Sequence, residues 1–454
     1  MPDRARLNGK GLAAALGGQL GGTVRDLHRL SGGASRVTCA FELEVSGAPP
    51  RRLILQMERG EAATEGGKVP MERALLEAAH AAGVPVPAVV AMGVHDAVGA
   101  DWLVVERLEG ETIPRKILRD AAWGEARRAL AAQCGRALAG IHTIDPDTIA
   151  GLPPADPLGN PLPYLDALGE VRPALELGVR WLDAHRLEGG PRVTLHGDFR
   201  FGNFMVGPEG LRGVLDWELA HAGDAAEDIG WLCAPAWRFG GRAEVGGFGA
   251  LDEFLAAYES AGGARVEPDR VHWWQVYATV KWATICALQA SAHLSGATRS
   301  VELAAIGRRV CESEWDLFAL LGVEPLDDAP EPPARGITHA PFGRPTAAEL
   351  VEAVREYLET AVMEHSEGGA RFEARVARNA LAIAERELLM GPEVSSAHTH
   401  RLHDLGMGDD AALAAAIRAG DFDDGWEPLA TALAASARDQ LLVANPSYLP
   451  AASA

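Results

Sequence analysis

The feature that most constrains this chain is a pair of polar motifs, each of which follows a short apolar stretch. The sequence HGDFRFGN occupies residues 196–203, and LDWE occupies residues 215–218. Asp198 precedes Asn203 by five positions, the interval between the Asp and the Asn of a kinase catalytic loop. Asp216 ends a predicted short strand, where the metal-binding Asp of a kinase hairpin belongs. The order of these residues predicts phosphoryl transfer.

Each of these polar side chains suits one task in that reaction. Asp198 would orient an attacking hydroxyl group and take its proton, so it is the predicted catalytic base. Asn203 and Asp216 are predicted metal ligands, because Mg2+ prefers oxygen atoms. Arg200 would stabilise charge on the transferring group. The alternative is that Asp198 and Asn203 are turn formers in an ordinary loop, and the order of the remaining features argues against it.

The segment ahead of the motifs indicates a small, mostly β lobe. Residues 37–45 alternate between apolar and polar, and residues 53–57 mark a second strand. Residues 71–82 are typical of a helix. A loop of small residues precedes both strands and consists of Ser31, Gly32, Gly33, Ala34 and Ser35. Backbone amides in such a loop can cradle phosphate, so we expect the loop to contact a nucleotide.

The pattern of apolar residues and prolines divides the chain into four predicted segments. They are an N-lobe at 1–110, a helical C-lobe with both motifs at 111–323, a Pro-rich linker at 324–342, and a helical domain of unknown role at 343–454. Within the last segment, Pro392 is expected to end a helix. The predicted fold class is α+β: a bilobal core with a five-stranded antiparallel sheet and a mainly helical C-lobe, plus a C-terminal all-α domain.

Composition excludes several classes of protein. The net charge of −21 argues against nucleic-acid binding, which needs clustered Lys and Arg. The five cysteines are far apart, so they indicate neither a zinc site nor a disulfide framework. The most apolar long segment, 271–288, contains Gln275 and Lys281 and therefore predicts a buried helix, not a membrane span. No signal-like apolar stretch is found at the N-terminus, so a cytoplasmic location is expected.

Taken together, the motifs resemble the aminoglycoside phosphotransferase-like family, which has a protein-kinase-like fold and includes choline and homoserine kinases. The resemblance covers roughly residues 10–320 and is similar to the branch fused to certain acyl-CoA dehydrogenases. Besides the two polar motifs, it is carried by LSGGASR at 30–36, GVPVP at 83–87 and VERLEG at 105–110. The C-terminal part resembles an uncharacterised helical domain found attached to such phosphotransferases.

The resemblance implies a function and several roles. ATP and Mg2+ would be the cofactors, with Asp198 as the base and Asn203 and Asp216 holding the metal ion. Asp228 would steady the catalytic loop, and helix capping is the alternative for it and for Asp224. The hinge that meets adenine through its backbone would consist of Glu106, Arg107 and Leu108.

One position departs from the family pattern. Kinases place a lysine on the third strand, and a helix glutamate holds it. Glu72 fits the glutamate, but Gln56 stands where the lysine is expected. Either Arg36, Arg59 or Lys68 supplies the missing charge, or activity is low, or the site binds nucleotide without catalysis.

The sequence therefore predicts a small-molecule kinase, an ATP- and Mg2+-dependent phosphotransferase with an alcohol group as acceptor. A hydroxyacyl thioester and an aminoglycoside-like compound are the two acceptor classes considered. The alternative is a catalytically weak or inactive nucleotide-binding scaffold. Glu218 and His221 are further candidates for metal or acceptor contact, and the many tryptophans are expected mainly to pack the core. A protein partner, or self-association, is considered for the C-terminal helical domain.

Overall fold

The chain divides into two compact units. The computed structural model describes residues 9–30, 36–58, 68–94, 98, 100–155, 161–323 and 344–449. Unit 1 combines residues 1–157, 189–233 and 237–271, and unit 2 combines residues 158–188, 234–236 and 272–454. The predicted loop at 31–35, Arg59 and the predicted linker at 324–342 lie outside the described residues.

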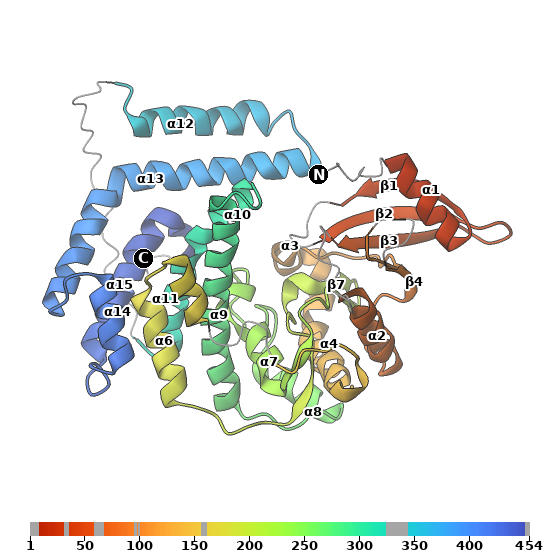
Figure 1. Ribbon diagram of the computed structural model, residues 1–454, viewed down its shortest axis with the longest axis horizontal. Coiled ribbons are helices and arrows are strands. Elements are labelled where there is room, and N and C mark those ends of the chain that lie inside the picture. The colour runs from red at the N-terminus through yellow and green to blue at the C-terminus, as the bar shows by residue number, and fades with distance from the viewer. Residues whose placement is uncertain are drawn as a thin grey trace. The chain divides into compact units, whose positions relative to one another are not determined.

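Unit 1 contains the predicted five-stranded antiparallel sheet, in the order β1-β2-β3-β5-β4 (Figure 1). Its strands are β1 (Thr23–Arg29), β2 (Arg36–Glu44), β3 (Arg51–Glu58), β4 (Val89–Gly93) and β5 (Trp102–Glu106). β2 and β3 are the two strands that alternation of apolar and polar residues predicts, because such a pattern fits a sheet with two different faces.

One face of this sheet is apolar and is covered by α1 (Gly9–Leu20), which lies across the strands in Figure 1. Leu53 and Leu55 of β3 join Phe41 of β2 and Leu16 of α1 in a buried cluster. Since successive side chains of a strand point to opposite faces, the residues between them point away from this cluster.

The opposite face of the sheet meets α2 (Lys68–Ala81) and is mixed, with buried apolar residues such as Leu103 beside polar ones. Arg36 lies directly across from Glu58 on the neighbouring strand, and Gln56 lies two residues further along the same face. Glu72 of α2 is buried and bonds to Arg36. Gln56, which stands at the position expected for the kinase lysine, therefore lies on the same face of the sheet as the cationic Arg36.

The rest of unit 1 is mainly helical, with two short antiparallel strand pairs. Its helices are α3 (Pro114–Arg119), α4 (Gly124–His142), α7 (Ala225–Cys233) and α8 (Leu251–Ser260), and α4 packs against α8. The pairs are β6 (Arg192–Leu195) with β9 (His221–Asp224), and β7 (Phe204–Gly207) with β8 (Gly210–Val214). These pairs position both polar motifs, one between β6 and β7 and the other between β8 and β9.

In the described residues of unit 2, all regular secondary structure is helical. Its helices are α5 (Leu162–Leu168), α6 (Pro173–Ala184), most of α9 (Pro268–Leu294), α10 (Val301–Ile306), α11 (Val310–Leu320), α12 (Ala347–Tyr357), α13 (Gly368–Asp404), α14 (Asp410–Ala419) and α15 (Glu427–Ala444). α14 packs against α6, and α15 packs against α11 and α13. The C-terminal helices therefore share one packed unit with helices that precede the predicted linker.

The predicted buried helix at 271–288 lies in α9 and is confirmed. Val271, Gln275 and Lys281 are all buried. Among the residues that the structure describes, no helix combines the length and the hydropathy needed to cross a membrane.

The predicted helix end at Pro392 is wrong. Pro392 lies inside α13, which continues for 37 residues. Proline lacks an N–H and crowds the carbonyl one turn earlier, which bends a helix without always ending it. Figure 1 shows α13 as two segments that meet at an angle. The other predicted end in this region is confirmed, since Gly420 closes α14 with a left-handed backbone.

Candidate active site

The loop between β6 and β7 is held in a fixed shape by a glycine and a buried carboxylate. Gly197 has a φ of +78°, and a side chain on it would collide with the carbonyl oxygen of Leu219. Asp228 accepts hydrogen bonds from the backbone amides of His196 (2.7 Å) and Gly197 (2.9 Å). Burial alone would raise the pKa of Asp228, but its bonds to His142 and to these amides lower it. The prediction that Asp228 steadies this loop is confirmed.

The Asp198 carboxylate is fixed by three donors. Nε of Arg200 donates to both carboxylate oxygens, at 2.8 and 3.0 Å. Nδ2 of Asn203 donates to Oδ2 at 2.6 Å, and Nε1 of Trp231 donates to Oδ1 at 2.8 Å. The Arg200 guanidinium in turn lies 4.7 Å from the ring centroid of Trp237. A carboxylate held in this way keeps one orientation, which a general base requires.

Leu215 joins the two polar motifs through its backbone. Its amide donates to the Asn203 carbonyl at 2.8 Å. The His196 ring accepts from the Asp198 amide through Nδ1 (3.2 Å), so Nε2 carries the proton that is donated to the Leu215 carbonyl (3.1 Å). Burial lowers the pKa of His196, so the ring is neutral, as this pattern requires. Asp216 follows Leu215 directly and is thereby placed next to Asn203 and Asp198.

Asp216 stands in surroundings that disfavour its own charge. Burial, together with three neighbouring carboxylates, raises the pKa of Asp216 to about 7. The three are Glu218, Asp198 and Glu72. The Asp216 backbone has a φ of +67°, a left-handed conformation that costs energy for any residue except glycine. Crowded carboxylates on a strained loop are an arrangement that a divalent cation would relieve.

The donor set here fits Mg2+. Asp216 offers carboxylate oxygens, and Asn203 keeps its Oδ1 available because its Nδ2 is bonded to Asp198. Mg2+ is commonly held by only one or two protein side chains, with phosphates and water completing the shell. The described residues contain no group of three or more His, Cys, Asp or Glu side chains that could hold a metal ion.

Arg36 occupies the position beside Glu72. It is only 6% exposed and forms an ion pair with the Glu72 carboxylate. Its Nε lies 3.9 Å from the Glu218 carboxylate. Burial alone would lower the pKa of Arg36, but the neighbouring carboxylates raise it, so its charge is retained. Lys68, by contrast, is exposed at the start of α2, and Gln56 is the neutral neighbour of Arg36 on β3.

The predicted hinge residues lie where β5 ends. The Glu106 amide donates to the Ala88 carbonyl at 2.9 Å, and the Arg107 amide donates to the Arg52 carbonyl at 3.1 Å. Within the described ranges, the Leu108 amide has no hydrogen-bond partner. It is therefore the backbone donor in this segment that a ligand can use, and its contact with adenine stays a prediction.

Other predicted residues have structural roles. Both ring nitrogens of His221 are engaged, by the Glu227 carboxylate and the Leu219 carbonyl, so neither is left for a metal ion. Asp224 caps α7 through the Ala226 amide at 3.0 Å and forms an ion pair with Arg270, which confirms the predicted capping.

Trp231 is a site residue that the sequence did not distinguish from the other tryptophans. Its indole bonds directly to Asp198, whereas Trp217 packs against the His196 ring. Trp231 lies three residues after Asp228 on α7, so one helical turn places both side chains toward the loop at 196–203. That spacing is the signal that would have found it.

Two curated relatives share part of this chain. Probable acyl-CoA dehydrogenase IBR3 of Arabidopsis thaliana is 32% identical over 171 residues, which is 33% of this chain and 20% of the relative. Acyl-CoA dehydrogenase family member 10 of Mus musculus is 28% identical over 197 residues, which is 40% of this chain and 18% of the relative. The chain thus spans about a fifth of the length of these proteins.

A solved structure from Ralstonia eutropha, provisionally assigned as an aminoglycoside phosphotransferase, has a similar fold. It superimposes with a TM-score of 0.52 at 20% identity and covers 68% of this chain and 98% of its own. At this identity the likeness concerns the fold alone. It confirms the predicted α+β, protein-kinase-like fold class.

Matches to protein families complete the comparison. Residues 364–448 match a domain of unknown function (DUF6285), in agreement with the predicted uncharacterised helical domain. Residues 26–274, just over half of the chain, match the phosphotransferase enzyme family. The predicted resemblance is thereby confirmed, and it indicates phosphotransfer to a small molecule. This chain belongs to the phosphotransferase enzyme family.

Proposed function

We propose that this chain transfers the γ-phosphoryl group of ATP, with Mg2+, to a hydroxyl group of a small molecule. The observation that carries the proposal is the convergence of three side chains from two motifs. Asp198 and Asn203 are joined by a 2.6 Å hydrogen bond, and Asp216 is tied to them through the Leu215 amide.

The residues divide the reaction between them. The acceptor oxygen attacks the γ-phosphorus, the bond from that phosphorus to the bridging oxygen of ADP breaks, and the hydroxyl proton passes to Asp198. Arg200 fixes the orientation of Asp198 and places positive charge beside it. The products are ADP and a phosphate ester.

The nucleotide would be held by both parts of the site. When bound, Mg2+ would neutralise phosphate charge, with Asn203 and Asp216 as its protein ligands. Arg36, oriented by Glu72, would supply the cation that kinases take from their third-strand lysine. The loop at 31–35 and the hinge at 106–108 are the further nucleotide contacts that we propose.

Arg36 also bears on the alternative, a nucleotide-binding scaffold. That alternative depended on the neutral Gln56. A buried arginine paired with Glu72 removes the main reason for expecting a weak site, because an arginine retains its charge. The geometry around Asp198 therefore favours an enzyme.

Two classes of acceptor remain in the proposal, a hydroxyacyl thioester and an aminoglycoside-like compound. The likeness to two acyl-CoA dehydrogenase family proteins favours the thioester. The fold alone favours neither, since one fold serves many acceptors.

The test is ATP turnover with a panel of hydroxyl compounds from both classes, with the phosphate ester identified by mass. Asp198→Asn should lower turnover by about a thousandfold and leave nucleotide binding intact. Asp252→Asn, which changes an exposed aspartate on α8, is the matched control and should keep full activity. Turnover that survives Asp198→Asn would remove Asp198 as the base.

The remaining assignments are proposals of wider scope. The segment limits at 110, 323 and 342 and a cytoplasmic location belong to this group. So does a protein partner, or a second copy, for the C-terminal helices, where Leu350, Val354 and Tyr357 of α12 are exposed at helical spacing. Light scattering of the full chain with and without Leu350→Gln/Val354→Gln would test self-association.

A further inference from the structure

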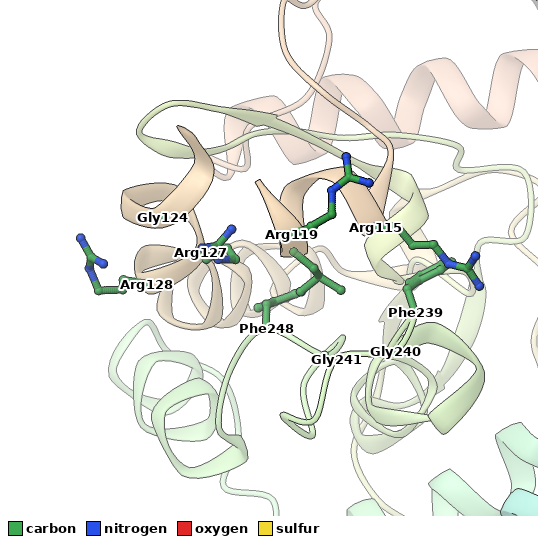
Figure 2. Close-up of a pocket in the computed structure, with 11 residues that line it drawn as sticks. Arg115, Arg119, Gly124, Arg127, Arg128, Phe239, Gly240, Gly241 and Phe248 are labelled. Atoms are coloured by element: carbon green, nitrogen blue, oxygen red, sulfur yellow. The ribbon is translucent and has the colours of Figure 1, made fainter. Parts of the chain in front are cut away.

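A second charged site lies in unit 1, and the mechanism above makes no use of it. A cavity of about 590 Å³ opens between α3, the start of α4 and the loop that follows Trp237 (Figure 2). Four arginines line it, Arg115 and Arg119 from α3 and Arg127 and Arg128 from α4. Among the described residues, no carboxylate lines the cavity. The chain has a net charge of −21, so this cluster of arginines has a charge opposite in sign to that of the chain as a whole.

One of these arginines builds the wall of the cavity. Nη1 of Arg127 donates to the carbonyls of Ile117 (2.6 Å) and Asp120 (2.9 Å), at the end of α3. This cross-link holds α3 against α4. The cavity therefore has a fixed wall, and Arg127 is unsuitable for a test that must leave the fold intact.

The other arginines keep charge available to a ligand. Arg119 pairs with Asp120 at 2.7 Å, and Arg128 pairs with Glu125 on the same turn of α4. In the part of the chain that the structure describes, no carboxylate pairs with Arg115. Four guanidinium groups and two carboxylates leave an excess of positive charge. Guanidinium forks match phosphate oxygens in pairs, so phosphate is the group that this surplus suits.

The opposite wall of the cavity is apolar and rests on the catalytic loop. Phe239 and Phe248 line the cavity, and their rings lie 6.3 and 4.7 Å from the ring of Phe201, which follows Arg200 directly. Phe239 also lies 6.4 Å from Trp237, the ring beneath the Arg200 guanidinium. Phe239 and Phe248 therefore connect the wall of the cavity to the segment that carries Asp198.

We propose that this arginine cavity binds a phosphate group of the acceptor, so that the acceptor is a hydroxyl compound that already carries phosphate on an apolar body. This inference rests on the proposed function and narrows its substrate class. A polyamine such as an aminoglycoside would be repelled by the four arginines, whereas a phosphate-bearing compound would be attracted to them. Phe239 and Phe248 would contact the apolar body.

Pyrophosphate is the probe for the cavity, titrated into the full chain in the presence of saturating ADP and Mg2+. The double variant Arg115→Gln/Arg119→Gln should weaken pyrophosphate binding by about tenfold or more, because two charge-assisted contacts are lost. Arg73→Gln, at an exposed arginine of α2, is the control and should bind as the wild type does. ADP affinity should be the same in all three proteins. Equal pyrophosphate affinity in the wild type and the double variant would overturn the proposal.

A kinetic measurement identifies the source of the phosphate. With an acceptor from the panel, pyrophosphate should compete with the acceptor and not with ATP, and the double variant should raise KM for the acceptor with little change in kcat. Inhibition that is noncompetitive with the acceptor would assign the cavity to a free anion and overturn the acceptor role. Failure to bind or turn over ATP would instead refute the proposed function, while the pyrophosphate titration still decides whether the cavity binds phosphate.

Discussion

At the scale of single residues, the site is a balance between few cations and many carboxylates. Arg36 of β2 and Gln56 of β3 both lie on the face of the sheet that meets α2, and in kinases a third-strand lysine is held there by a helix glutamate. The negative charge of Asp216 is disfavoured in this site, because burial and neighbouring carboxylates raise its pKa to about 7. The positions of Arg36 and Asp216 lead to the two predictions that follow.

The first prediction is a rescue across strands. Arg36→Gln should lower kcat/KM by about a hundredfold or more, because the phosphates lose their cation and Glu72 is left buried without a partner. Adding Gln56→Lys to that variant should restore part of the activity, since the new ammonium group would lie on the same face of the sheet. Steady-state kinetics of the two variants measures this. A double variant no better than Arg36→Gln would show that position 56 cannot reach the phosphates.

The second prediction concerns pH and the metal-free protein. The raised pKa means that folded Asp216 keeps a proton that the unfolded chain loses, so this group lowers stability as pH rises toward about 7. Asp216→Asn should therefore stabilise the protein in EDTA. The gain should grow by at most about 1.4 kcal/mol per pH unit between about pH 4 and pH 7, then level off. Urea unfolding at several pH values checks this, and a gain that shrinks with pH would contradict it.

At the scale of secondary-structure elements, the sequence predicts strands correctly where apolar and polar residues alternate. It also does so where a short apolar stretch leads into a polar motif. β2 and β3 could be predicted because their two faces differ. β1 was missed because it is an edge strand with no fully buried residue, so its sequence lacks alternation. The helix end predicted at Pro392 is wrong because packing of α13 against α12 and α15 outweighs the loss of one hydrogen bond.

The candidate site could be predicted only in part for a similar reason. The sequence assigns Asp198, Asn203 and Asp216 to one predicted site because their order and spacing follow a known motif, and the structure brings the segments that carry them together. Trp231 and the ion pair of Arg36 with Glu72 depend on contacts between segments distant in sequence. No local pattern encodes such contacts, so the sequence left Arg36 as one of three choices.

The third prediction concerns the attachment of α7 to the loop at 196–203. Asp228→Ala would leave two buried backbone amides without an acceptor and should lower stability by about 3 kcal/mol or more. Asp228→Asn retains one acceptor oxygen and should cost less. Urea unfolding of both variants measures the order. A loss that is equal in the two variants would show that the amides do not depend on this side chain.

At the scale of the whole molecule, the C-terminal helices belong to a unit that also contains α6, α9 and α11. The predicted division into a linker at 324–342 and a helical segment at 343–454 stays a prediction, because proline composition indicates a linker but does not encode long-range packing. Arg418 of α14 shows the packing most clearly, since it pairs with Glu176, a residue of α6 that is 5% exposed.

The fourth prediction follows from that ion pair. Arg418→Ala would leave the Glu176 carboxylate buried without its partner and should lower the stability of unit 2 by about 1 to 3 kcal/mol. The matched control is Arg180→Ala, which removes an exposed pair with Asp423 and should cost less than about 1 kcal/mol. Thermal unfolding of the full chain compares the two. A control that costs as much as Arg418→Ala would contradict this account.

The most direct test of the whole account is the binding of Mn2+ and ADP, which needs no knowledge of the acceptor. Electron paramagnetic resonance should detect a bound Mn2+–ADP complex in the wild type and in Asp198→Asn, because Asp198 is assigned to the acceptor. Asp216→Asn should lose that complex by about a hundredfold in affinity, and Asn203→Ala should weaken it less. If Asp216→Asn binds Mn2+–ADP as tightly as the wild type, the two motifs do not form a metal–nucleotide site and the account is wrong.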